Sequence, residues 1–252
     1  MKVFVLENEK ELGIAAARSI SEGLRKAIEE RGEANYLVST GSSQFSTFEA
    51  LIADRSIDWT KVTMFHLDEY VNLPVTHIAS FRKYLKERFA DKVPLRRAVY
   101  VNGEGDVSAH LRELEREMAE NPIDVGAIGI GENAHIAFND PPADFSKECA
   151  YHIVYLSDTC KRQQVGEGWF ETADDVPRMA ISMTPKQIMK CRKIVCAVPG
   201  ERKAKAIFDT LRLETTDPNV PATLLREHGS CEVYIDRGSA SMCSAELLAR
   251  YS

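Results

Sequence analysis

The sequence predicts an α/β protein: a single Rossmann-like domain over residues 1–252, whose mostly parallel sheet is covered by helices on both faces. Three observations support this prediction. A chain of 252 residues with 44% hydrophobic content can bury a large core and still fit one α/β domain. Short β-branched segments alternate with longer amphipathic ones. The β-rich segments are apolar almost throughout, which is typical of parallel strands buried on both faces.

The expected elements follow in order along the chain. Residues 3–6 are a β-branched run that predicts a strand, and apolar residues then recur at helical spacing from 12 to 27. A second strand is expected at 36–38, before a polar loop and a helix that contains Phe48 and Leu51. The same alternation predicts strands at 62–67, 99–101, 123–128, 153–156, 194–198 and 231–235, and helices at 79–89, 107–118 and 202–211. No repeat or Pro/Gly-rich linker marks a domain boundary.

Charge and composition exclude several classes of protein. The net charge of -6 comes from interspersed signs without a long basic block, so no nucleic-acid-binding surface is predicted. The sequence has no apolar run of membrane-spanning length, and its apolar N-terminal segment is too short for a signal peptide. We therefore expect a cytoplasmic protein that does not enter a membrane. The six cysteines form no C-x-x-C pair and are interpreted as reduced, mostly buried thiols rather than metal ligands.

Four polar loops each follow a predicted strand, at residues 39–43, 68–70, 129–140 and 199–203. In open parallel sheets, ligands bind outside the carboxyl ends of the strands, where the chain runs into the next helix. These loops are therefore the candidate functional site.

The first and last of these loops are candidates for binding an anion. Thr40, Gly41, Ser42 and Ser43 bring hydroxyls, backbone N–H groups and a permissive glycine to the start of a helix, which suits a phosphate. The same residues would also serve as an ordinary helix N-cap. Lys203 lies at a helix start, where the helix dipole disfavours a cation, so it either meets an anion or is simply solvated.

Asp68 is a candidate for acid–base chemistry, and its neighbour Glu69 is a candidate for contacting the substrate. They directly follow a predicted buried strand, where a partly dry cleft would raise the pKa of a carboxyl toward that of a useful general base. A helix cap or a solvated turn is the alternative interpretation of the same acidic pair.

His135 is a further acid–base candidate because it has polar neighbours. Glu132, Asn133 and Asp140 all lie within five positions and could orient the imidazole or stabilise its charge. The nearby Gly-Ile-Gly at 129–131 lacks the third glycine of a dinucleotide-binding fingerprint, so a nucleotide site is only weakly indicated.

Two long segments carry a family resemblance. Residues 65–74, FHLDEYVNLP, with His77 and Ser80, are similar to a pattern F-x-x-D-E-Y-V-x-L-P-x-x-H-P-x-S. Residues 131–141, GENAHIAFNDP, are similar to G-N-D-G-H-I-A-F-N-E-P, and residues 40–44 stand where that pattern has the phosphate loop T-G-G-T-P. Over roughly residues 36–210, in the same order, the chain resembles the glucosamine-6-phosphate deaminase (isomerase) family, relatives of 6-phosphogluconolactonase.

The resemblance implies a reaction and roles for individual residues. Asp68 would be the base that moves a proton between C2 and C1 of an aminosugar, and His135 would help to open the sugar ring. Residues 40–42 and Lys203 would hold the 6-phosphate. The implied reaction converts glucosamine 6-phosphate, the expected small-molecule partner, to fructose 6-phosphate and ammonia without a metal or an organic cofactor.

The chain departs from the family pattern around the histidine and at the phosphate. Asn133 replaces the aspartate two residues before His135, and Asp140 replaces the glutamate five residues after it. We therefore hypothesise that Asp140 supplies the charge to the imidazole and that Asn133 positions the loop, with Glu132 as the other local candidate. The family's phosphate-binding arginine has no clean counterpart, and Arg162 is assigned as its substitute.

Two other functions stay open at this stage. One is a lactone hydrolase of the 6-phosphogluconolactonase type, although Tyr70 and the residues after His135 fit the deaminase pattern better. The other is a sugar-phosphate-binding sensor without turnover. Galactosamine 6-phosphate differs from glucosamine 6-phosphate only at C4, and no residue is identified that reads this carbon. The sequence leaves a homo-oligomer open.

Overall fold

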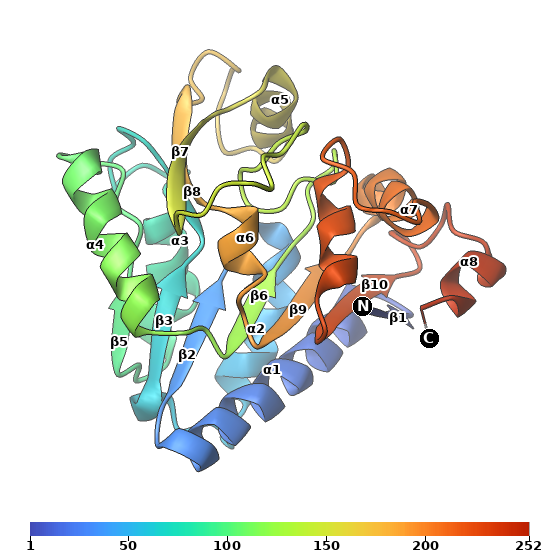
Figure 1. Ribbon diagram of the computed structural model, residues 1–252, viewed down its shortest axis with the longest axis horizontal. Helices are drawn as coiled ribbons and strands as arrows, with labels where there is room; N and C mark the ends of the chain where they lie inside the picture. The colour runs from blue at the N-terminus through green and yellow to red at the C-terminus, as the bar shows by residue number, and fades with distance from the viewer. Residues whose placement is uncertain (252) are drawn as a thin grey trace.

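The computed structural model describes residues 1–251. Its main sheet contains β1 (Lys2–Leu6), β2 (Ala34–Val38), β3 (Val62–His66), β5 (Arg97–Val99), β6 (Val125–Ile128), β9 (Lys193–Val198) and β10 (Cys231–Asp236). These seven strands are all parallel and lie in the order β1-β10-β9-β6-β2-β3-β5 (Figure 1). The predicted parallel α/β sheet is confirmed. The earliest strand pairs with the latest, so both ends of the chain contribute to one edge of the sheet.

The strand order reverses between β2 and β6. From β2 the sheet continues through β3 to β5, and from β6 it continues in the opposite direction through β9 and β10. Loops that leave the carboxyl ends of two such strands diverge and open a crevice between them. Residues 39–43 follow β2 and residues 129–140 follow β6, so both polar loops lie at this crevice.

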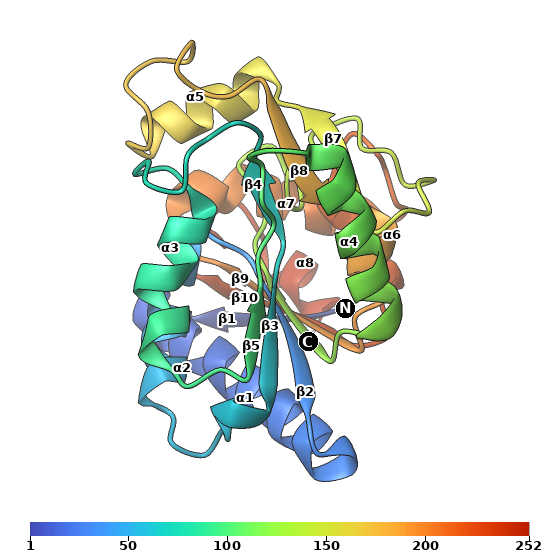
Figure 2. The same ribbon diagram turned by 90° about the vertical axis from the view of Figure 1, so that its left-hand side faces the viewer.

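Helices cover both faces of the sheet, as predicted (Figure 2). One face packs against α1 (Glu9–Arg31), α2 (Phe45–Ala53) and α3 (Phe81–Arg88), and the other against α4 (Val107–Glu120), α6 (Pro185–Ile188), α7 (Ala204–Arg212) and α8 (Ala245–Ala249). Successive side chains of a strand point to opposite faces. In β2, Tyr36 and Val38 join the first of these two cores, whereas Leu37 joins the second.

Helix α1 illustrates how the sequence sets these elements. The Asn8 side chain accepts a hydrogen bond from the backbone N–H of Glu11 at 3.0 Å, which caps the helix. The apolar residues expected at helical spacing between 12 and 27 are all buried against the sheet. The helix ends at Gly32, whose φ of 81° is left-handed and therefore suits glycine.

A second, antiparallel sheet was not predicted. It contains β4 (Asp68–Tyr70), β8 (Met179–Met183) and β7 (Tyr151–Tyr155), with β8 in the centre. Helix α5 (Asp158–Gly166) lies beside β7 and β8 in both views (Figures 1 and 2). Residues 68–70 were expected to be a polar loop after the strand at 62–67, but they pair with β8. The short β8 was missed entirely, and the expected strand at 153–156 is shifted to 151–155.

Short 3-10 helices connect several of these elements. They are η1 (Ser42–Gln44), η2 (Trp59–Lys61), η3 (Ala90–Lys92), η4 (Glu201–Lys203) and η5 (Pro221–Glu227). The six cysteines are free thiols, and four of them are buried, in agreement with the expectation of mostly buried thiols. Within residues 1–251, no helix has both the length and the apolar character needed to cross a membrane.

Candidate active site

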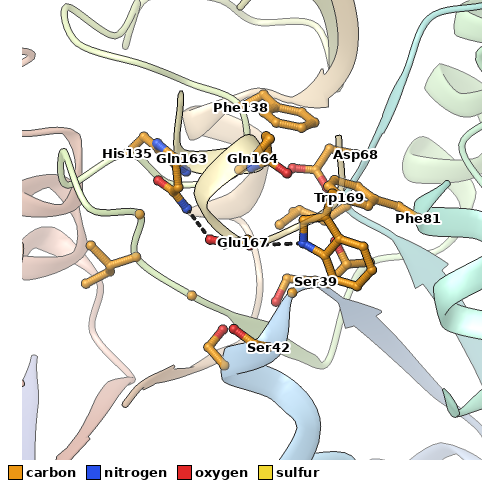
Figure 3. Close-up of a pocket in the computed structure, with 18 of the residues that line it drawn as sticks. Ser39, Ser42, Asp68, Phe81, His135, Phe138, Gln163, Gln164, Glu167 and Trp169 are labelled. Carbon is orange, nitrogen blue, oxygen red and sulfur yellow. Dashed lines mark hydrogen bonds between the residues drawn. The ribbon is translucent and has the colours of Figure 1, made fainter. Parts of the chain in front are cut away.

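A pocket lies at the crevice where the strand order reverses. Its wall comes from the loops after β2 and β6, from β4 and the start of α3, from the end of α5 with the residues that follow it, and from η4. Side chains from these segments converge on one space (Figure 3). Segments that lie far apart in the sequence therefore meet at a single site.

The loop after β2 and Lys203 form one end of the pocket. Thr40, Gly41, Ser42 and Ser43 all line it, as does Lys203. Gly41 has a φ of 99°, and no atom lies within 4 Å of the place where a Cβ would be, so its backbone is open to a ligand. A row of hydroxyls and N–H groups at a helix start, with a cation beside it, is an arrangement that binds phosphate.

Lys203 carries a positive charge that the protein leaves unpaired. Among residues 1–251, no carboxylate lies within ion-pair distance of its ammonium group, and none accepts a hydrogen bond from it. Burial lowers the pKa of the Lys203 ammonium, and the carboxylates of Glu167 and Glu132 act in the opposite direction. A half-buried cation with no ion-pair partner is a strong attractor for an anionic ligand.

Asp68 enters the same pocket from β4. Its side chain is almost fully buried and receives no hydrogen bond from the described residues. Burial raises the pKa of this carboxyl to about 8, and the nearby charge of Glu69 contributes to the same shift. A carboxylate with this pKa is a far stronger base than an exposed one, so Asp68 is suited to removing a carbon-bound proton.

Glu69 was expected to contact substrate, but the structure turns it away from the pocket. Adjacent residues of a strand face opposite sides, so Glu69 enters the protein interior while Asp68 faces the pocket. Its carboxylate accepts hydrogen bonds from the Ser80 hydroxyl at 2.9 Å, from the backbone N–H groups of Phe81 and Arg82, and from Nε of Arg82 at 3.1 Å. Glu69 thus fixes the start of α3 to β4.

His135 lines the pocket and has two oxygen partners on one ring nitrogen. Its Nδ1 lies 2.6 Å from Oδ1 of Asn133 and 3.1 Å from Oδ1 of Asp140. The Asn133 amide N–H₂ donates to Asp140 at 3.0 Å, so its oxygen faces the imidazole. Two acceptors at Nδ1 require this nitrogen to carry the proton, which leaves Nε2 for the ligand.

Asp140 is held in its ionised form. Burial acts to raise its pKa, but hydrogen bonds from His135, Asn133 and Ser157, together with the charge of His135, outweigh burial and hold the pKa well below its usual range. Oδ2 of Asp140 accepts a hydrogen bond from the Ser157 hydroxyl at 2.6 Å. The arrangement brings Asp140 to His135 as hypothesised, and it also gives Asn133 a direct contact with the ring.

The loop around His135 has tight geometry. A Cβ at Gly131 would lie 2.2 Å from the His135 ring, so only glycine leaves room for the imidazole. Ala134 and Ala137 have positive φ values of 64° and 51°. Left-handed backbone at a residue other than glycine costs on the order of 1 kcal/mol, and such strain clusters at functional sites.

Glu132 and Arg162 lie apart from the reacting groups. The Glu132 carboxylate forms an ion pair with Nη2 of Arg202 at 2.9 Å and does not contact His135. Arg162 is exposed, donates to the Thr159 hydroxyl at 3.2 Å, and does not line the pocket. Helix α5 directs Arg162 outward, so its assignment as a substitute for the phosphate arginine has no support in this arrangement.

Sequence reasoning missed the residues that α5 and its following turn bring to the pocket. These are Gln163, Gln164, Glu167 and Trp169. Their spacing of three and four residues places the first three on one helix face, but polar side chains on such a face give no hydrophobic periodicity. The aromatic Trp169 beside a run of polar residues was the available signal.

These features agree with what is found in known proteins. Residues 7–234 match the family model described as glucosamine-6-phosphate isomerases/6-phosphogluconolactonase. The chain belongs to this family.

Three proteins illustrate the relationship. The chain is 33% identical over 245 residues to glucosamine-6-phosphate deaminase of Bacillus cytotoxicus, covering 97% of this chain and 90% of that protein. A solved monomeric glucosamine-6-phosphate deaminase superposes with a TM-score of 0.87 at 28% identity, covering 96% of this chain and 100% of that one. The 6-phosphogluconolactonase of Trypanosoma brucei shares the fold, with a TM-score of 0.78 at 15% identity over 96% of this chain and 98% of that one.

The burial of Asp68 predicts a pH-dependent effect on stability. Its carboxyl keeps its proton up to a pH of about 8 in the folded chain, against an ordinary value of 3.8. The folded state therefore binds more protons than the unfolded state between these values, so stability falls as the pH rises through this window. We expect Asp68→Asn to raise the free energy of unfolding at pH 8.5 by at least about 1 kcal/mol, since one pKa unit corresponds to about 1.4 kcal/mol.

Urea unfolding at pH 4.5 and pH 8.5 measures this effect. The gain from Asp68→Asn should be clearly larger at the higher pH. Asp174→Asn makes the same change at an exposed position and serves as the matched control. An equal change in stability at both pH values for Asp68→Asn would show that this carboxyl does not titrate abnormally.

Proposed function

We propose that the protein is an aminosugar-6-phosphate deaminase/isomerase that converts glucosamine 6-phosphate to fructose 6-phosphate and ammonia. One observation carries the proposal: a buried basic carboxylate, an imidazole with a charged partner and an anion-binding end line the same pocket. The three parts match the three tasks of the reaction, which are proton transfer at carbon, ring opening and retention of a sugar phosphate. Membership of the family supports the same reaction.

In the proposed reaction, His135 opens the pyranose ring. Its unprotonated Nε2 takes the proton of the C1 hydroxyl and delivers a proton to the ring oxygen as the bond between C1 and that oxygen breaks, which yields an open chain with a C1 aldehyde. The imidazole is positively charged during this exchange, and Asp140 stabilises that charge at Nδ1. The Asn133 amide oxygen accepts a hydrogen bond from Nδ1, which keeps the ring in the tautomer that presents Nε2 to the sugar.

Asp68 then transfers a proton between the two carbons. The aldehyde acidifies the proton at C2, and the Asp68 carboxylate removes it, which forms an enolamine. The protonated Asp68 returns this proton to C1, and the electron pair of the double bond forms the new C–H bond. The product is a ketimine at C2, which water hydrolyses to fructose 6-phosphate and ammonia.

The phosphate anchors the sugar at the opposite end. Residues 40–43 offer hydroxyls and backbone N–H groups, and Lys203 offers the charge. Anchoring at C6 converts the proton transfer into a reaction within one complex, which is a large part of enzymatic rate enhancement. Sugars without the phosphate should therefore react slowly.

An ammonia-release assay tests the proposed function. Purified protein is incubated with glucosamine 6-phosphate, galactosamine 6-phosphate and 6-phosphogluconolactone, and ammonia, ketose phosphate and acid release are each followed. Ammonia and ketose phosphate in equal amounts from a hexosamine phosphate are expected. Hydrolysis of the lactone without ammonia would identify a lactonase instead, and saturable binding without any product would identify a sensor.

Asp68 and Lys203 should affect different kinetic constants. Asp68→Asn keeps the shape but removes the base, so kcat should fall by about 10² or more while substrate binding is retained. Lys203→Ala removes an ion pair present before and during the reaction, so it should raise KM more than it lowers kcat. In the wild type, kcat/KM should rise with pH through about 8, because the base must be ionised in the free enzyme. Near-normal kcat in Asp68→Asn would remove Asp68 as the base.

Two substitutions test whether Asp140 or Glu132 is the charged partner of His135. Asp140→Asn is isosteric but removes the charge at Nδ1, so kcat should fall at least about tenfold with little change in KM. Glu132→Gln should change kcat little, since Glu132 pairs with Arg202 and does not line the pocket. Steady-state kinetics of both variants decide the matter, and the reverse order of effects would assign the role to Glu132.

A further inference from the structure

Glu167 places a second carboxylate in the wall of a pocket that receives an anion. It lies directly after α5, at the position where the chain turns toward Trp169. In Figure 3 its carboxylate projects between the side of the pocket marked by Asp68 and His135 and the side marked by Ser39 and Ser42. Neither the proposed base nor the proposed phosphate ligands require a carboxylate here.

The protein holds this carboxylate in one orientation. Oε1 accepts a hydrogen bond from Nε2 of Gln163 at 2.8 Å, and Oε2 accepts one from Nε1 of Trp169 at 3.1 Å. The Gln163 amide oxygen in turn accepts a hydrogen bond from the backbone N–H of Glu132 at 3.3 Å. Glu167 is therefore tied both to its own turn and to the loop that carries His135.

This arrangement leaves Glu167 able to accept further hydrogen bonds. A carboxylate has about four acceptor positions, and the two donors occupy one on each oxygen. An ionised carboxylate cannot donate, so a complementary ligand group must bring a hydrogen. A sugar hydroxyl meets this requirement and forms a short, charge-assisted bond.

The other assignments leave few hydroxyls for Glu167. The phosphate at C6 belongs to residues 40–43 and Lys203, the ring oxygen at C5 belongs to His135, and C1 and C2 belong to Asp68. The hydroxyls at C3 and C4 remain.

The residues on either side of Glu167 lie against the phosphate end: a Cβ at Gly166 would be 3.1 Å from Nη2 of Arg202, next to Lys203. The Trp169 ring lies 6.4 Å from that of Tyr84, whose hydroxyl donates to the Gly41 carbonyl at 2.7 Å. Glu167 therefore lies toward the phosphate end, where C4 is the nearer carbon.

We propose, on the basis of the function proposed above, that Glu167 is a specificity-determining residue that accepts a hydrogen bond from the C4 hydroxyl of the hexosamine 6-phosphate. The hydroxyl offsets the repulsion between this carboxylate and the substrate's phosphate. The C4 epimers direct this hydroxyl differently, so Glu167 selects glucosamine over galactosamine 6-phosphate. A substrate without the donor leaves the carboxylate desolvated and unpaired, a mismatch against which enzymes discriminate strongly.

A substrate–variant cycle tests the assignment. Wild type, Glu167→Gln and the control Glu171→Gln are compared on glucosamine 6-phosphate and on its 3-deoxy and 4-deoxy analogues. Residue 171 is an exposed glutamate near the same turn, so its substitution makes the same chemical change outside the pocket. The measurements are kcat/KM for ammonia release and Kd by calorimetry.

In the wild type and in Glu171→Gln, loss of the C4 hydroxyl should lower kcat/KM by about tenfold to hundredfold, the range of a charge-assisted hydrogen bond. In Glu167→Gln this difference should shrink to about threefold or less, and the preference for glucosamine over galactosamine 6-phosphate should narrow with it. Loss of the C3 hydroxyl should have the same effect in all three proteins. Trp169→Phe, which removes one donor to Glu167, should reduce the C4 effect partially.

The outcomes separate this inference from the proposed function. An equal penalty for 4-deoxy substrate in wild type and Glu167→Gln, or a change confined to the 3-deoxy analogue, overturns the inference while leaving deamination intact. Absence of ammonia from every substrate overturns the proposed function, and the calorimetric Kd values then decide the role of Glu167 alone. Absence of binding by any hexosamine phosphate overturns both.

Discussion

The site depends on the hydrogen bonds around one buried carboxylate that does not enter it. Strand β4 places Asp68 and Glu69 next to each other in the interior, where an uncompensated charge costs several kcal/mol by order of magnitude. Glu69 is compensated by Arg82, the Ser80 hydroxyl and backbone N–H groups at the start of α3. Asp68 receives no such compensation and has a raised pKa instead. Full satisfaction of one carboxylate therefore allows the other to be a strong base.

The pocket has a charge gradient along its length. Lys203 and residues 40–43 form a positive and hydrogen-bond-donating end, while Asp68 is buried, which disfavours its ionised form. A substrate with an anionic group at one end and a weakly acidic carbon at the other fits this gradient in one direction only. The orientation of the ligand thus follows from electrostatics before any specific contact is made.

The sequence was informative about features that leave a pattern within a short stretch of residues. Apolar strands and amphipathic helices revealed the parallel sheet, and the polar loops after β2 and β6 marked the site, because the carboxyl ends of such strands meet at one edge. The antiparallel sheet escaped because β4 is short and charged. Glu69 was predicted to contact the substrate because residues 68–70 were interpreted as a loop. The alternation of side chains between the two faces of a strand, which turns Glu69 away from the pocket, was therefore not considered. Glu167 was missed because a polar helix face has no periodic hydrophobic signature.

Ser157 links the start of helix α5 to the carboxylate that contacts His135. Its hydroxyl accepts the backbone N–H of Cys160 at the start of α5 and donates to Asp140, the partner of His135. Unwinding of the first turn of α5 would thus release Asp140 from this donor and loosen the imidazole pair. The order of the first turn of α5 and the position of the imidazole pair therefore depend on the same hydroxyl group.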